Sequence, residues 1–140
     1  FQESVEFMTR QEVTREWWDT NRHDVDLYVS EYVIEEAKFG DEEAASLRMK
    51  ALEGIAVLDT TPPSESVAHE IMKLGLIPER ATPDAFHIAV STVHEMDVLL
   101  TWNCTHLANP VILKEINRLI RGLGYEPPMV YTPDEMLGGK

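Results

Sequence analysis

The stretch "DAFHIAVSTVHEMDVLLTWN", residues 84–103, decides the fold. Its first part is apolar on nearly every side of a helix that we predict from Thr82 to about Met96. Residues 98–100 then form an uninterrupted apolar run, which is typical of strands buried on both faces of a parallel sheet. The stretch therefore predicts a central helix that leads into a buried strand.

Helical and strand patterns alternate on both sides of this stretch. Apolar spacing, capping residues and glycine stops predict helices over residues 6–21, 30–40, 41–54, 64–74 and 109–122, with a short one at 132–136. Short apolar runs predict strands at residues 26–30, 55–59 and 129–132. Such alternation implies an α/β protein with a parallel sheet and helices on both faces. Ligands of these sheets bind outside the carboxyl ends of the strands.

Length and charge narrow the class of protein. The chain of 140 residues has the usual size of one domain. Its net charge of -13 argues against unspecific phosphate neutralisation, because that mode of nucleic-acid binding needs a basic face. Either the partner is not nucleic acid, or acids cluster around divalent cations. No apolar run approaches the roughly 18 to 20 residues that span a bilayer, and the lone Cys104 cannot form an internal disulfide. We expect a cytoplasmic protein that does not engage a membrane.

Asp84 has two interpretations, and the chain contains a comparison for them. The triplet Thr82-Pro83-Asp84 is repeated as Thr132-Pro133-Asp134, and both copies are typical of helix starts with Thr as N-cap and Pro in the first turn. In the second copy Glu135 completes a capping box, so that copy needs no catalytic explanation. The helix after Asp84 is so apolar that its start is expected deep in the molecule. There a carboxylate is costly unless a positive group, such as a metal ion, meets it.

Two further positions are candidates for the same site. Glu36 shares a helical face with Val33, Ala37 and Gly40, which are small or apolar, although a solvated surface glutamate is an equal alternative. Asn103 follows the predicted buried strand and can offer an amide oxygen to a metal or a hydrogen bond to a phosphate. Magnesium and manganese sites need hard oxygen ligands from separate parts of the chain, so these positions would act together.

The assembled pattern resembles the PIN-domain ribonucleases, of the kind found as VapC toxins in VapBC toxin–antitoxin pairs. The resemblance covers nearly the whole chain. In "SEYVIEEAKFG", Glu36 falls on the family's acid in its second helix, and Asp84 falls on the acid that opens the helix before a strand. In "LLTWN", Asn103 falls where the family often has an acid after Thr.

The resemblance implies a single PIN-like domain over residues 1–140, a three-layer fold with a central parallel sheet and helices on both faces. It implies a hydrolase, a Mg²⁺- or Mn²⁺-dependent endoribonuclease that cuts single-stranded RNA and is inhibited by a cognate antitoxin protein. By resemblance, Glu36, Asp84 and Asn103 are catalytic, and Glu36 and Asp84 ligate the metal, which activates a water for attack on phosphorus. Thr101 and His106 are candidate substrate contacts, although His106 can also be an ordinary exposed histidine at a helix start.

The chain departs from the family pattern in two places. The family's first acid ends an N-terminal strand, and nothing before Gln11 matches that motif, so we expect the native protein to have an upstream strand that this chain lacks. Asn103 replaces the usual acid, which favours the alternative of a catalytically weakened or inactive PIN-like module that binds RNA or protein. A flavodoxin-like phosphoryl-transfer or receiver protein is a weaker alternative. Trp17 and Trp18 suggest a homodimer contact, with core packing as the alternative.

Overall fold

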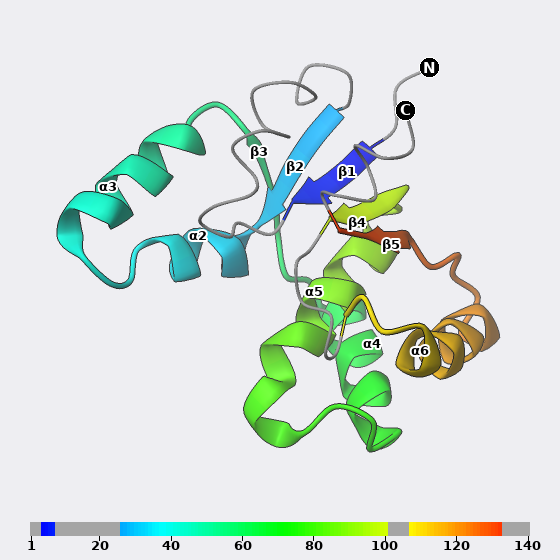
Figure 1. Cartoon of the computed structure of the whole chain (residues 1–140). Coiled ribbons are helices and arrows are strands. Elements are labelled where there is room, and N and C mark those ends of the chain that lie inside the picture. Colours follow the sequence, from blue (N-terminus) through cyan, green and yellow to red (C-terminus); the bar gives the residue numbers. More distant parts are fainter. Residues whose placement is uncertain (1–3, 8–25, 101–106, 133–140) are drawn as a thin grey trace.

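The computed structural model describes residues 4–7, 26–100 and 107–132 (Figure 1). Its strands are β1 Ser4–Phe7, β2 Asp26–Ser30, β3 Ala56–Leu58, β4 Val98–Leu100 and β5 Met129–Tyr131. Its helices are α2 Glu31–Ala37, α3 Glu42–Ala51, α4 Pro62–Lys73, α5 Thr82–Val93 and α6 Pro110–Gly122, with a 3₁₀ turn, η2, at Glu79–Ala81. None of these helices is long and apolar enough to cross a membrane.

The five strands form one parallel sheet in the order β3-β2-β1-β4-β5. The prediction of a mixed α/β protein with a parallel sheet is confirmed. The chain builds β1, β2 and β3 toward one edge, then crosses back to place β4 on the other side of β1, with β5 outside it. The central strand is therefore the first one in the chain.

This central strand corrects the interpretation of the N-terminal residues. A helix was predicted from Glu6, and no strand was expected before Gln11. Instead Glu6 and Phe7 belong to β1, where Glu6 is in register with Tyr28 of β2 and Leu99 of β4. The remainder of the predicted helix, with Trp17 and Trp18, lies outside the described residues.

Strand β4 joins the apolar clusters of the molecule. Val98 and Leu100 pack into a cluster with Val33 of α2, whereas Leu99, between them, packs with Ile88 of α5 and with residues of α4 and α6. Successive side chains of a strand point to opposite faces, so α2 and the α4–α6 helices contribute to cores on opposite sides of β4. Figure 1 shows α4, α5 and α6 gathered on one side of the strands, while α2 and α3 extend away from the end of β2.

Helix starts follow local capping chemistry at most positions. As predicted, Asp41 caps α3 by accepting from the backbone N–H of Ala44, and Asn109 caps α6. Helix α4 begins at Pro62, earlier than expected, because Thr61 and Ser64 form a capping box.

The prediction that Thr82 caps α5 is wrong. Helix α5 begins at Thr82 itself, and Ala81 is the N-cap residue. The Thr82 hydroxyl instead donates to the carbonyl of Glu79. The reason is that the 3₁₀ turn η2 runs directly into α5, which takes Thr82 into the first turn and turns its side chain back onto the preceding carbonyl.

Candidate functional site

The sheet topology places a candidate ligand site at the carboxyl ends of β1 and β4, which are neighbours in the sheet. After β1 the next strand, β2, lies toward one edge of the sheet, and after β4 the next strand, β5, lies toward the other edge. The space between β1 and β4 is therefore a topological switch point. In open α/β sheets, ligands bind outside the carboxyl ends of strands at such a point. Glu6 is the residue before the last in β1, so an acid belongs to the strand that borders this point.

Three of the predicted site residues cannot be placed. Thr101, Asn103 and His106 follow β4 directly in the chain but lie outside the described residues.

Glu36 lies in α2, one residue before that helix ends, and its side chain is not among those described. The start of α2 is well anchored. The buried Ser30 hydroxyl accepts from the backbone N–H of Val33, and Glu31 Oε1 accepts from the backbone N–H of Thr60 at 2.9 Å. Because Ser30 ends β2 and Thr60 follows β3, α2 begins at the carboxyl ends of two adjacent strands. Local sequence gives no signal for the bond between Glu31 and Thr60, because the two residues are 29 positions apart in the chain.

Asp84 is the third residue of α5 and is partly buried. The prediction that α5 is a central helix is confirmed, because seven of its 12 residues are buried. The expectation that its start lies deep in the molecule is wrong, since Pro83 is exposed and Thr82 is partly exposed. A carboxylate that water can reach has less need of a bound cation, and the helix N-terminus already favours an acid there. Both interpretations of Asp84 therefore remain.

The two predicted ligands lie on helices with different principal neighbours. Helix α2 packs against β2 and α3, whereas α5 packs against α4, η2 and β4. In the described part of the chain, no three His, Cys, Asp or Glu side chains come together as a metal site. The side chains of Glu6 and Glu36 are not part of that set, so the predicted carboxylate cluster is not assembled by the described residues alone.

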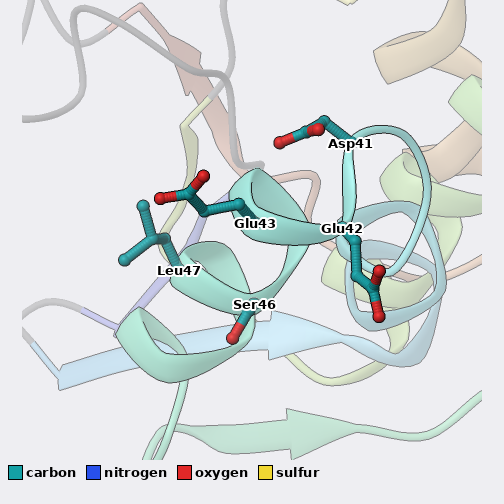
Figure 2. A pocket seen from close by; sticks show the side chains of 5 residues that line it. All are labelled: Asp41, Glu42, Glu43, Ser46 and Leu47. Carbon is teal, nitrogen blue, oxygen red and sulfur yellow. The ribbon is translucent and has the colours of Figure 1, made fainter.

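A shallow acidic depression lies at the start of α3, lined by Asp41, Glu42, Glu43, Ser46 and Leu47 (Figure 2). Its acidity has a structural explanation. Asp41 Oδ2 accepts from the Ala44 backbone N–H at 3.1 Å. Glu42 and Glu43 occupy the first turn, where a negative charge interacts favourably with the positive end of the helix dipole.

Two histidines, His87 within α5 and His94 at its C-cap, contribute to the structure of the protein. His87 is buried in the core. His94 Nε2 lies 2.8 Å from the backbone carbonyl of Asp59, and a carbonyl can only accept, so this nitrogen carries the hydrogen. The bond joins the end of α5 to the segment after β3. Local sequence gave no signal for it, because the two residues are far apart in the chain.

No protein-family model, curated protein or solved structure matches this chain.

Proposed function

We propose that this protein is a Mg²⁺- or Mn²⁺-dependent endoribonuclease of the PIN-like kind, acting in the cytoplasm as the toxin of a toxin–antitoxin pair. The observation that carries the proposal is the position of β1. The resemblance requires a central N-terminal strand with an acid near its carboxyl end, and β1, with Glu6, lies between β2 and β4. The sequence pattern had predicted a helix from Glu6 and no strand here, so the match is independent of the motifs around Glu36 and Asp84.

The arrangement of the clusters supports the three-layer form of this fold. Val98 and Leu100 of β4 pack into the cluster that contains Val33 of α2. Leu99, between them, packs into the cluster of α4, α5 and α6, as expected where helices cover both faces of a sheet. The strand order has β1 at its centre and the switch point beside it, where a phosphodiester would have to bind.

The donor chemistry fits a hard divalent cation. Glu6 in β1, Glu36 in α2 and Asp84 in α5 are carboxylates from separate parts of the chain, the usual ligand set for magnesium together with several waters. When bound, the cation would supply an activated water and positive charge for the phosphate oxygens. Asp84 is only partly buried, at the start of α5.

The partners follow from charge. With a net charge of -13, the protein would attract a basic antitoxin segment, whereas the RNA phosphates would be held through the cation. The second candidate function, a PIN-like module that binds RNA or protein without cutting, is favoured by Asn103, which lacks the charge of the family's usual acid.

Calorimetric titration of Mn²⁺, with cleavage of a single-stranded RNA followed in the same samples, tests the proposal. The variants are Glu6→Gln, Glu36→Gln and Asp84→Asn. We expect each to reduce cleavage by more than about 100-fold, since removing a ligand exceeds the 10- to 100-fold effect typical of the groups that support one.

The chain offers matched controls for two of these variants. Glu35→Gln removes an exposed acid beside Glu36, and Asp134→Asn changes the other Thr-Pro-Asp triplet; both should bind and cut like the wild type. A wild-type protein that neither binds Mn²⁺ nor cuts RNA would refute the nuclease. Retention of a fluorescent single-stranded RNA by that protein would then support the binding module.

A further inference from the structure

The carboxyl end of α2 is held by a side chain from another helix. Helix α2 has only seven residues and no basic residue in its last turn, although a cation there would offset the negative end of the helix dipole. Arg48, on α3, supplies that charge. Its Nε donates to the carbonyl of Ala37 at 3.2 Å, and its Nη2 donates to the carbonyl of Phe39.

These two bonds close the corner between α2 and α3. Gly40 has a φ of 92°, a left-handed conformation that favours glycine and reverses the chain within the four residues that separate the helices. A Cβ on Gly40 would meet Arg48 Nη2 only at 3.7 Å, an ordinary contact, so it is the backbone conformation that requires glycine here. Arg48 then spans the corner by binding carbonyls nine and eleven residues earlier in the chain.

Apolar packing holds α2 more than α3. Val33 and Ala37 of α2 are buried in a cluster with Leu100 of β4, whereas α3 adds only the partly buried Met49 to that cluster. Phe39 is 70% exposed, and its backbone carbonyl accepts a hydrogen bond from Arg48 Nη2. Of the ten residues of α3, all of them described, only Ala45 is buried. The guanidinium fork, partly buried itself, adds a directional restraint on the last turn of α2 to the apolar contacts of Ala37.

We propose that Arg48 is a positioning residue for Glu36. Glu36 immediately precedes Ala37, whose carbonyl Arg48 binds, so the guanidinium sets the direction of the helix turn that carries the carboxylate. Arg48 acts through the backbone and does not itself contact metal or RNA. This inference rests on the proposed function, because it assigns Arg48 a part in metal binding through Glu36.

The test compares Mn²⁺ affinity and RNA cleavage in Arg48→Gln and Arg48→Lys with the wild type. We expect about 10-fold weaker Mn²⁺ binding in Arg48→Gln, in the range seen when a group that supports a metal ligand is lost. Arg48→Lys should fall between, because a single ammonium keeps the charge but lacks the planar fork. The KM for RNA should stay unchanged, and saturating Mn²⁺ should restore the kcat, which a merely unfolded or weakened protein would not show.

Arg118→Gln is the matched control. Arg118 is an exposed arginine of α6 that pairs with Glu115 within its own helix, and its loss should leave Mn²⁺ affinity at the wild-type value. Circular dichroism establishes that each variant is folded at the temperature of the titration. If Arg48→Gln does not fold, the comparison of Arg48→Lys with the wild type still tests the inference.

Three outcomes separate the inference from the proposed function. Wild-type Mn²⁺ affinity in a folded Arg48 variant overturns the role of Arg48 and leaves the nuclease standing. A loss of kcat that saturating Mn²⁺ does not restore also overturns it, since Arg48 would then serve structure alone. A wild-type protein that binds no Mn²⁺ removes both.

Discussion

Two regions of the molecule differ in how much apolar packing holds their helices. The α4–α6 body, helices α4, α5 and α6 with the cluster between them, contains side chains that are fully or almost fully buried, among them Ile71, Ile88 and Ile116. In the α2–α3 unit, residues 31–51, α3 buries only Ala45 of its described residues and leaves Leu47 64% exposed.

The difference separates stability from geometry. Burial of apolar side chains supplies most of the free energy of folding, and the α4–α6 body has most of it. A single hydrogen bond contributes only about 0.5–1.5 kcal/mol net, but it has a direction. The bonds of Arg48, which join α3 to the end of α2, can therefore set the angle between these helices without adding much stability. Of the proposed metal ligands, Asp84 belongs to the body and Glu36 to the unit.

The largest expected effect on stability is in the body. Ile88→Ala, at a position 1% exposed, should lower the free energy of unfolding by about 2–5 kcal/mol, because it removes buried methylene groups and leaves a cavity. Leu47→Ala on α3 should change it by less than about 0.5 kcal/mol. Urea unfolding of the two variants measures both changes in the free energy of unfolding, provided that the m-values equal that of the wild type. Equal losses would mean that α3 contributes as much apolar packing as α5, and the comparison would fail.

Loss of a helix cap should lower the free energy of unfolding by less than Ile88→Ala does, and by different amounts in the two regions. Thr61→Ala, which breaks the capping box with the buried Ser64, should cost about 1–2 kcal/mol, and Asp41→Ala, at an exposed cap of α3, about 0.5 kcal/mol. Thermal unfolding of the two variants gives the order. A larger loss at Asp41 would show that α3 contributes more to global stability than its burial indicates.

The start of α5 should be insensitive to its threonine. Thr82→Ala should change the free energy of unfolding by less than about 0.5 kcal/mol, since its hydroxyl bonds the Glu79 carbonyl and does not cap the helix. Asn109→Ala, which removes the cap of α6, should cost about 1 kcal/mol and is the control. A loss at Thr82 as large as that at Asn109 would restore the capping role predicted from the Thr-Pro-Asp triplet.

The smallest expected effect is electrostatic and lies on the surface of the body. Lys73 Nζ lies 2.9 Å from Glu70 Oε2, and its hydrogen bond and charge lower the pKa of the Glu70 carboxyl below its ordinary value. A pKa that is lower in the folded protein stabilises it at neutral pH, and this contribution is lost as the pH falls through the folded pKa.

Lys73→Gln should therefore raise the pKa of Glu70 toward its ordinary value, as followed by NMR titration of that carboxyl. Lys114→Gln, on α6, is the control and should leave the titration of Glu70 unchanged. An unchanged Glu70 in Lys73→Gln would mean that the ion pair is not formed in solution, as is common for exposed pairs.

Local patterns predicted those elements whose residues carry their own signals. Asn109-Pro110 predicted the start of α6, Asp41 that of α3, and the apolar run at residues 98–100 predicted β4. These signals act within one turn or one strand, so neighbouring residues are sufficient to specify them.

Strand β1 shows where local patterns fail. Its four residues, "SVEF", contain an acid and adjoin apolar residues at helical spacing, so the helical interpretation prevailed. The strand exists because Val5 and Glu6 pair with residues of β2 and β4 that are distant in the sequence. Asp84 is similar, since the apolar character of α5 predicted burial of the helix but not the exposure of its first turn.

The sequence by itself determined the α/β class, the starts of most helices, and Glu36 and Asp84 as candidates for a metal site, because these depend on residue type and short spacing. Only the tertiary structure decided that the first strand is central, that Glu31 and Arg48 anchor the two ends of α2, and that α2 and α5 have different neighbours. Strand pairing and contacts between helices join residues far apart in the chain, and no local pattern specifies which distant partner a residue meets.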